Sequence, residues 1–504
     1  MSKKVRVRFA PSPTGGLHLG GVRTVLFNYL FAKKNGGDFI VRIEDTDQTR
    51  FVEGAEDYIF NTLEWCGLQP DESPKHGGPF APYRQSERKA SYRKYAEELV
   101  AKGLAYYAFD TAEELDTKRK EIANFQYSHS TRSLMKNSLT LSAHETTDLI
   151  NNNTPYVIRV KLQSHEQIEF TDLIRGTVHF DTTQVDDKVL LKADGMPTYH
   201  LAVVVDDYAM QITHAFRGEE WLPSAPVHIF LWKHLFGLDN MPQWAHLPLI
   251  LKPDGNGKLS KRDGDRLGFP VFAMDWTDPR TNEQTTGFKE RGFLPEAFIN
   301  MLAMLGWNSG SEQELFSLEE LVNFFSLERV HKGGAKFDYE KAKWFNHEWI
   351  KKVDVDELRK MVEKLFAENN ITTDDVEILD KVIALTKDRC TFINDFVQQA
   401  GYFFNAPETI DIAAIQPKWD EKKKAFFDAL IQLWNDNFKT EATALEQQFK
   451  TLAETQQIKA GELMLPFRIM LVGGKFGPAV FDIAQVIGKT DTIQRIERVM
   501  NELN

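Results

Sequence analysis

The sequence predicts an α/β fold in which a parallel sheet is split by an α+β insertion and followed by an all-helical region. Three observations predict this fold. Near the N-terminus a strand, a turn rich in Pro and Gly, a helix and a second strand follow one another directly, which is the pattern of a crossover between parallel strands. After Asp110 the chain becomes more polar, and apolar strand patterns return near Pro197. From Phe337 onward, apolar residues recur at helical spacing.

The overall composition limits the number of domains, the partners and the compartment. A chain of 504 residues is too long for one hydrophobic core, so we expect several domains. A formal net charge of -12 argues against a protein whose whole surface binds nucleic acid, but leaves room for local basic patches. Cys66 and Cys390 are the only cysteines, which argues against a disulfide scaffold or a cysteine-ligated zinc site. Because no leader pattern and no long apolar run are present, we expect a cytoplasmic protein.

The stretch from Arg8 to Arg23, RFAPSPTGGLHLGGVR, joins the first strand to the first helix. Its prolines and glycines end the strand, and the helical spacing that follows predicts a helix from near Gly20 and Gly21 to Gly36. Free N–H groups at a helix start bind anions, and glycines let a phosphate come close. His18 adds a further donor. The stretch therefore predicts a nucleotide-binding turn.

Further helices and strands follow this unit. The second predicted strand, Asp38–Ile43, places Glu44 at its carboxyl end, where ligands of parallel sheets bind. A helix is expected from about Val52 to Cys66. We expect Ser86 to cap another helix that runs to Lys102.

The segment after Asp110 is interpreted as an insertion into the sheet domain. It opens with a capping box, Thr111 with Glu114, and contains a short alternating strand at Tyr156–Val160. The apolar run Val203–Val205, bounded by acids, then predicts a buried strand. The sheet domain is therefore expected to resume near this run.

The segment Lys258–Arg262, KLSKR, lies in a glycine-rich and locally basic loop. Alone, such a loop is most simply solvated surface, and the turn before the first helix could be an ordinary loop. Together, a motif at the end of the first strand and a mobile Lys-Ser-Lys segment after the last strand are typical of a clamp around a nucleoside triphosphate. Beyond it, Pro295 is expected to begin a helix, and Ser317 with Glu320 forms another capping box.

These motifs resemble those of a known family. His18–Gly21 is similar to the HIGH motif, and Lys258–Arg262 to the KMSKS motif, of the class I aminoacyl-tRNA synthetases. Six segments are similar in order and spacing to the bacterial glutamyl-tRNA synthetases: RFAPSPTG, VRIEDTD, PYRQSER, PTYHLA, FRGEEW and LPEAFINMLAMLGW. The resemblance is dense from Arg6 to about Asn346 and thinner beyond, where LPFRIMLVGG carries it.

The resemblance implies a ligase of protein synthesis that works in two steps. The carboxylate of L-glutamate attacks the α-phosphate of ATP to give glutamyl-adenylate and pyrophosphate, and the 3′-terminal adenosine of tRNA(Glu) then takes the glutamyl group. This task requires positioning and charge stabilisation at phosphorus. The resemblance implies that Mg2+ is bound with ATP and that the catalytic residues are His18, Lys258 and Lys261. The implied ATP-binding residues are Gly20, Gly21, Arg50, Ser260 and Arg262.

Glutamate carries two carboxylates and an ammonium, so its site needs arginines and an acid. By the resemblance, the glutamate-binding residues are Arg8, Ala10, Ser12, Glu44, Tyr199 and Arg217. Glu44 would face the α-ammonium. From the residues alone, Arg8 could equally lie on the surface, Glu44 could cap a helix and Tyr199 could be core. Val203 departs from the family because many relatives have an asparagine there, near the substrate.

The resemblance also implies how the domains divide. The implied divisions are a Rossmann-type catalytic domain at 1–84 and 195–245, an inserted domain for the tRNA acceptor end at 85–194, a stem-contact domain with the KLSKR loop at 246–336, and a helical anticodon-binding domain at 337–504. Arg389 and Arg468 are the expected tRNA contacts in the last domain, although each could be an ordinary helix-surface arginine. Relatives suggest a monomer. Some relatives hold zinc through a Cys-x-Cys motif in the insertion, but this chain has Tyr106–Phe109 there, so we expect no zinc.

Three other interpretations stay open. A glutaminyl-tRNA synthetase typically carries β-barrel anticodon domains, whereas strand-like alternation is absent after Phe337. A truncated relative that modifies a tRNA nucleoside lacks this last third of the chain. A non-enzymatic tRNA-binding protein on a synthetase fold would not need both His18 and Lys261. Whether the chain also charges tRNA(Gln) is left open.

Overall fold

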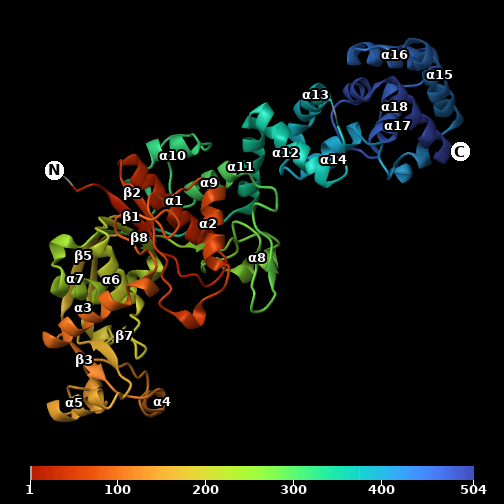
Figure 1. The fold of residues 1–504 in the computed structure, drawn as a ribbon. Helices are drawn as coiled ribbons and strands as arrows, with labels where there is room; N and C mark the ends of the chain where they lie inside the picture. Colours follow the sequence, from red (N-terminus) through yellow and green to blue (C-terminus); the bar gives the residue numbers. More distant parts are fainter. Residues whose placement is uncertain (1–2, 374, 504) are drawn as a thin grey trace. The chain divides into compact units, whose positions relative to one another are not determined.

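The computed structural model describes residues 3–373 and 375–503, which form two compact units (Figure 1). The first unit contains the chain up to Glu290 together with Phe298–Tyr339. The second unit contains Arg291–Ala297 and the chain from Glu340 onward. Among the described residues, no helix is long and apolar enough to cross a membrane.

A six-stranded sheet lies at the centre of the first unit. In spatial order its strands are β2 (Asp38–Val41), β1 (Arg6–Phe9), β8 (His214–Gly218), β9 (Gln243–Leu247), β5 (Gln167–Asp172) and β6 (Gly176–Asp181). Neighbouring strands are parallel except β5 and β6, which form an antiparallel hairpin. The predicted crossover is confirmed, because α1 (Leu19–Lys34) connects β1 to β2 and Arg6 lies opposite Asp38 in a parallel register.

Helix α1 covers the β1, β2 and β8 part of the sheet. Its side chains Val22, Val25 and Leu26 are fully buried, as are Val7 in β1 and Phe39 in β2. Complete burial of one such side chain stabilises the fold by about 1.5–3 kcal/mol. This packing fixes the start of α1 at the carboxyl end of β1, where the Pro-rich turn enters it.

The predicted strand at Val203–Val205 is wrong, because these residues lie in helix α6 (Tyr199–Ala209). Three consecutive β-branched residues favour a strand. Here the helix contacts α3 (Lys89–Ala101), α7 (Ala225–Leu235) and β7 (Val189–Leu191), so it is apolar on nearly every side and shows no amphipathic period. As a result Tyr199 is the first residue of a helix.

Helix α3 differs from the prediction at its N-terminus. A 3₁₀ turn over Gln85–Arg88 precedes it, and Ser86 is not its cap. Instead, the Ser86 hydroxyl donates to the Asp45 carboxylate at 2.6 Å, and the Ser86 amide donates to the same carboxylate at 2.8 Å. Ser86 therefore ties the start of the insertion to the loop after β2.

The insertion contains a second, three-stranded antiparallel sheet. Its order is β3 (Ala105–Ala108), β4 (Val157–Val160) and β7. Between β3 and β4 the chain forms α4 (Ala112–Glu121) and α5 (Ala143–Asn151), and the predicted capping box of Thr111 with Glu114 is confirmed. Strands β5 and β6 also lie within segment 85–194, yet they extend the central sheet. The insertion thus contributes two strands to the sheet that carries the site.

The remaining elements of the first unit are short. They include α2 (Ala55–Trp65), α8 (Lys261–Leu267), α9 (Pro295–Met304), α10 (Leu318–Phe324) and the strand pairs β10 (Ile250–Leu251) with β13 (Ala335–Lys336) and β11 (Trp276–Thr277) with β12 (Gln284–Thr285). The predicted helix start at Pro295 and the capping box of Ser317 with Glu320 are confirmed.

The second unit is helical, as the periodicity predicts. Its helices are α11 (Tyr339–Lys352), α12 (Val355–Glu368), α13 (Val376–Thr386), α14 (Asp395–Ala400), α15 (Glu421–Asn437), α16 (Ala442–Thr455), α17 (Ala460–Val472) and α18 (Val480–Leu503). Phe426, Phe449 and Phe467 are fully buried and pack together in its core. Helix α18 bends at Gly488, whose φ of 80° lies in the left-handed region that favours glycine.

Candidate functional site

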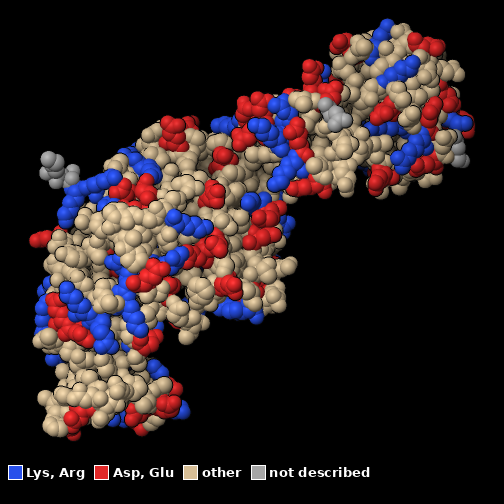
Figure 2. All heavy atoms as spheres, viewed as in Figure 1, with Lys and Arg blue, Asp and Glu red and all other residues tan. Residues whose placement is uncertain are grey.

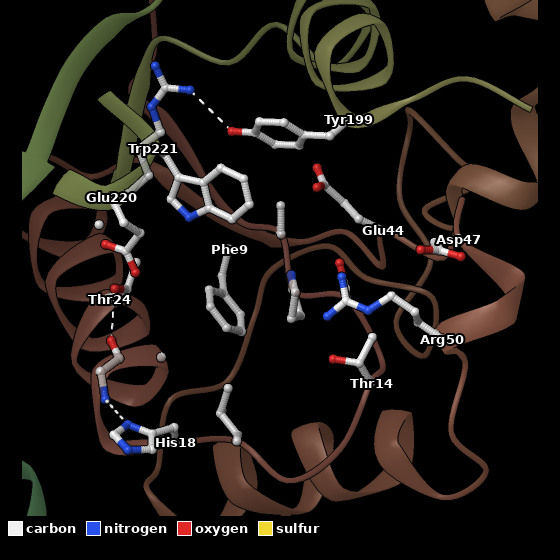
Figure 3. A pocket seen from close by; sticks show the side chains of 18 of the residues that line it. Phe9, Thr14, His18, Thr24, Glu44, Asp47, Arg50, Tyr199, Glu220 and Trp221 are labelled. Carbon is white, nitrogen blue, oxygen red and sulfur yellow. Dashed lines mark hydrogen bonds between the residues drawn. The ribbon is translucent and has the colours of Figure 1, made fainter. Parts of the chain in front are cut away.

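A cavity of about 1110 Å³ opens at the carboxyl ends of β1 and β8 (Figure 3), where parallel sheets bind their ligands. Most of the predicted site residues line it. Those residues are Arg8, Ala10, Ser12, His18, Gly20, Gly21, Glu44, Arg50, Tyr199, Arg217 and Lys258. Ser260, Lys261 and Arg262 lie outside its lining. Figure 3 also shows the Trp221 ring between Tyr199 and Phe9, so the cavity has aromatic as well as charged walls.

His18 is the residue that begins α1 and also faces the cavity. Its Nδ1 accepts a hydrogen bond from the Gly20 amide at 3.3 Å. Burial, and secondarily the charge of Lys258, lower the pKa of His18 to about 4, so the imidazole is neutral at neutral pH. Because Nδ1 accepts, the single ring proton sits on Nε2. That nitrogen is buried and has no partner in the protein, so it is available to donate to a ligand.

The start of α1 offers fewer free amides than the sequence suggested. The Leu19 amide donates to the Val271 carbonyl at 3.0 Å, and the Gly21 amide donates to the His18 carbonyl at 2.8 Å. A side chain at Gly21 would come within 2.6 Å of a terminal methyl of Leu17, so Leu17 would have to shift to make room for it. The donor that remains at this helix start is the His18 imidazole.

Arg8 and Glu44 are held by a buried ion network behind the cavity. The Arg8 Nε donates to both Asp207 oxygens, at 3.1 and 3.2 Å. Arg42 has no exposed side-chain surface and joins Asp207 to Glu44, at 2.9 and 3.0 Å. Although burial works in the opposite direction, Arg8 and Arg42 hold the pKa of Asp207 below its usual value. The network holds Arg8 and Glu44 in place and shares the Arg42 guanidinium among three acids, since Asp206 lies 3.8 Å from its Nε.

Arg217 is held differently, by neutral groups. Its Nε donates to His246 at 2.9 Å, and its Nη1 donates to His228 at 3.1 Å and to the Tyr199 hydroxyl at 3.2 Å, the bond drawn as a dashed line to Tyr199 in Figure 3. The guanidinium carbon lies 4.6 Å from the centre of the Trp244 ring. Its Nη2 is buried and has no hydrogen-bond partner in the protein. A carboxylate in the cavity would satisfy that group.

The KLSKR segment is only partly a loop. Helix α8 begins at Lys261, with Ser260 as its cap, and the Ser260 hydroxyl donates to Asp263 at 2.5 Å. Lys258 is paired with Glu220 at 2.6 Å and Lys261 with Glu283 at 2.8 Å, while Arg262 is exposed. In this arrangement the segment contributes Lys258 to the cavity, and the other predicted residues are not part of its lining.

Two further predicted positions occupy different surroundings. Arg50 lies in a 3₁₀ turn over Gln48–Arg50 and lines the cavity. Val203 is 3% exposed in the core around α6 and is not part of the lining.

Arg389 and Arg468 lie in the second unit. Arg468 donates through Nη1 to the carbonyls of Phe476, Gly477 and Pro478, the last at 2.6 Å, so part of its hydrogen-bonding capacity serves the loop before α18. Burial first, and then the charge of Arg389, lower the pKa of Arg468. On the face seen in Figure 2, basic and acidic side chains are interspersed rather than gathered into one basic surface.

Sequence reasoning missed the residues that support the cavity from behind. These are Arg42, Asp172, Asp207, His228 and His246. The signals were weak: a charged residue inside an apolar strand for Arg42, and an acid after an apolar run for Asp207. A lone histidine or aspartate at the other positions carries no pattern in the sequence.

Comparisons with known proteins agree over the whole chain. Residues 4–344 match a family model for the catalytic domain of class I tRNA synthetases (E and Q), and residues 339–500 match one for an anticodon binding domain. Two similar proteins named glutamate–tRNA ligase, from Porphyromonas gingivalis and Christiangramia forsetii, are 49% and 51% identical to this chain. The alignments cover 100% of this chain and 99% and 100% of theirs.

A solved structure gives the same result in three dimensions. The crystal structure of a glutamate tRNA ligase from Elizabethkingia meningosepticum, in complex with its amino acid, is similar with a TM-score of 0.95 and 47% identity. The match covers 100% of both chains. The chain therefore belongs to the glutamate–tRNA ligase family, within the class I tRNA synthetases.

Proposed function

We propose that the chain activates L-glutamate with ATP and transfers the glutamyl group to the 3′-terminal adenosine of tRNA(Glu). The observation that carries this proposal is the composition of the cavity. Two buried arginines, Arg8 and Arg217, and one buried acid, Glu44, face the same space as His18 at the start of α1. This set matches a substrate with two carboxylates and one ammonium beside a nucleotide.

Glutamate would be bound by its charges. The unpartnered Nη2 of Arg217 would donate to one carboxylate, and Arg8, whose bonds to Asp207 and Phe216 leave its Nη2 unused, would donate to the other. Glu44 would accept from the α-ammonium. Burial raises the pKa of Glu44, and an ammonium beside it would favour the charged carboxylate again. Ser12 and Tyr199 line the same space and would set its size.

ATP would lie between the start of α1 and Lys258. The Nε2–H of His18 would donate to a phosphate oxygen, and Lys258, and Lys261 after a shift of its segment, would offset charge that develops at the α-phosphate. Gly20, Gly21 and Arg50 also line the cavity. Bound Mg2+ would neutralise part of the phosphate charge. Within the described residues no group of three or more His, Cys, Asp or Glu side chains is placed to hold a metal, so the phosphates would supply most of the ligands of that ion.

The nucleic-acid side of the proposal rests on the domain order. Segment 85–194 would hold the acceptor end, segment 246–336 the stem, and the helical part from 337 the anticodon, with Arg389 and Arg468 as contacts. We further expect a monomer without zinc. Metal analysis of the purified protein tests the zinc prediction, and a stoichiometric amount of zinc would contradict it.

Charging assays test the proposal directly. With ATP, Mg2+ and glutamate, we expect aminoacylation of tRNA(Glu), and tRNA-dependent exchange of pyrophosphate into ATP. Parallel assays with tRNA(Gln) establish whether the chain discriminates between the two tRNAs. Binding of tRNA without either activity would contradict the proposal and favour a non-enzymatic tRNA-binding protein.

A further inference from the structure

The hydrogen bonds of Arg217 continue to two buried side chains, His246 and Asp172, that no substrate would contact. Strand β9 carries His246, whose Nε2 accepts from the Arg217 Nε at 2.9 Å. The other ring nitrogen, Nδ1, lies 2.6 Å from an oxygen of Asp172, the last residue of β5. Both His246 and Asp172 have no exposed side-chain surface. This series of hydrogen bonds therefore connects the wall of the cavity to the β5–β6 hairpin, which the insertion adds to the sheet.

The geometry fixes which nitrogen of His246 carries the proton. Burial lowers the pKa of His246, so the ring is neutral and has one N–H. The guanidinium of Arg217 can only donate, so Nε2 must be the acceptor and the proton must sit on Nδ1. The Asp172 carboxylate accepts that proton. Asp172 in turn is oriented by the amides of Ile174 and Arg175, each donating to its Oδ1 at 2.9 Å.

A second histidine repeats the arrangement on the other side of the guanidinium. The Nδ1 of His228 lies 3.1 Å from Arg217 Nη1, and its Nε2 lies 3.3 Å from His200 Nδ1. The side chains that accept from Arg217 are thus two neutral imidazoles and a tyrosine hydroxyl. Arg8, by contrast, is paired with the Asp207 carboxylate. Neutral acceptors orient Arg217 without offsetting its charge, which leaves that charge for a ligand.

We propose that His246, with its tautomer set by Asp172, is a positioning residue that turns Nη2 of Arg217 toward the cavity and so determines the affinity for a carboxylate of glutamate. The inference rests on the proposed function, because glutamate is the ligand that Arg217 would bind there. It adds that the β5–β6 hairpin of the insertion helps to build the amino-acid site.

The substitution Asp172→Asn tests the tautomer argument with almost no change of shape. The asparagine oxygen can keep the amides of Ile174 and Arg175 and, at 3.3 Å, the backbone amide of His246, and its NH2 group then faces His246 Nδ1. This forces Nδ1 to accept, so the proton moves to Nε2 and opposes the Arg217 Nε–H. We expect KM for glutamate to rise about tenfold or more, which corresponds to about 1.4 kcal/mol, with kcat and KM for ATP close to those of the wild type.

Two variants at His246 separate positioning from general damage. In His246→Gln the amide oxygen can still accept from Arg217, so KM for glutamate should stay near the wild-type value. In His246→Leu no acceptor is left, so KM should rise as in Asp172→Asn. Asp239→Asn, on an exposed turn of the same unit, is the matched control.

The outcomes are distinct. Parallel rises of KM for glutamate and ATP, or equal KM values for the Gln and Leu variants, would overturn the inference. If Asp172→Asn does not fold, the comparison of Gln with Leu at His246 still decides. A wild-type protein that charges no tRNA with glutamate would instead contradict the proposed function.

Discussion

The arginines that line the cavity are held in place by different kinds of neighbours. Arg42 is fully buried between Asp207 and Glu44, and removal of one member of such a network leaves an unpaired buried charge, at a cost of about 3–5 kcal/mol. Arg217 makes no comparable ion pair with its neighbours His228, His246 and Tyr199. Arg8 and Arg217, the two arginines assigned to glutamate, therefore play different roles: Arg8 belongs to a buried ion network, and Arg217 presents its charge to the cavity.

This difference predicts a selective effect of Arg217→Ala. Loss of a charged donor to a carboxylate should raise KM for glutamate about a hundredfold, whereas KM for ATP should stay within about twofold because ATP is held by other residues. Steady-state charging kinetics with each substrate varied in turn measure both values. Arg93→Ala, an exposed arginine on α3 paired with Glu97, is the control. An unchanged KM for glutamate would show that Arg217 is structural.

At the scale of elements, the segment that follows β10 and carries Lys258 and Lys261 would have to move for both lysines to reach ATP. Lys258 is paired with Glu220, and Lys261 with Glu283, in contacts that are partly or largely exposed. Exposed ion pairs contribute only about 0–1 kcal/mol each, so ATP phosphates can replace these glutamates at low cost. Lys261 lies outside the lining of the cavity in this arrangement, so it can reach the phosphates of ATP only if the segment shifts.

The substitution Lys261→Ala tests this role. If Lys261 acts on the phosphates of ATP, the variant should form glutamyl-adenylate about a hundredfold more slowly, the size of effect seen when one preorganised donor is removed. Its affinity for tRNA, measured by filter binding, should stay at the wild-type value. Glu283→Gln serves as control, because it frees Lys261 and should not slow the reaction. Equal losses in adenylate formation and tRNA affinity would contradict the assignment.

Elements with a local signal could be predicted from the sequence, and elements defined by their neighbours could not. The turn into α1 and the capping boxes at Thr111 and Ser317 depend on residues a few positions apart. Helix α6 looked like a strand because burial on several sides hides its helical period. His246 and Asp172 are 74 residues apart and meet only because β5 lies beside β9. No local pattern encodes that contact.

At the scale of the whole molecule, the two units differ in their histidines, and those whose pKa is lowered by burial lie in the first unit. Burial lowers the pKa of six histidines in the first unit: His18, His200, His214, His228, His234 and His246. The second unit contains a single histidine, His347. Because the unfolded chain takes up protons near the ordinary histidine pKa and the folded first unit does not, acid should destabilise the first unit selectively.

The direction and the pH range of this loss of stability can be worked out for two of these histidines. His18 and His200 have folded pKa values of about 4, against 6.5 for an unperturbed histidine. Between these values the unfolded state binds more protons, so stability falls as pH falls from about 6.5 toward 4. Each group should lower the free energy of unfolding by about 1.4 kcal/mol between pH 7.5 and 5.5. The raised pKa of Glu44 acts in the opposite direction, so a variant is needed to isolate the histidines.

Calorimetry of the full chain provides that test. The unfolding transition that glutamate and ATP shift upward belongs to the first unit, and we expect its midpoint to fall by several degrees from pH 7.5 to 5.5. The substitution His200→Gln removes one buried group that resists protonation, so it should reduce this pH dependence. His144→Gln, on the exposed face of α5, should leave it unchanged. A ligand-sensitive transition whose midpoint is equally steep with pH in both variants would place the acid sensitivity of the first unit in groups other than His200.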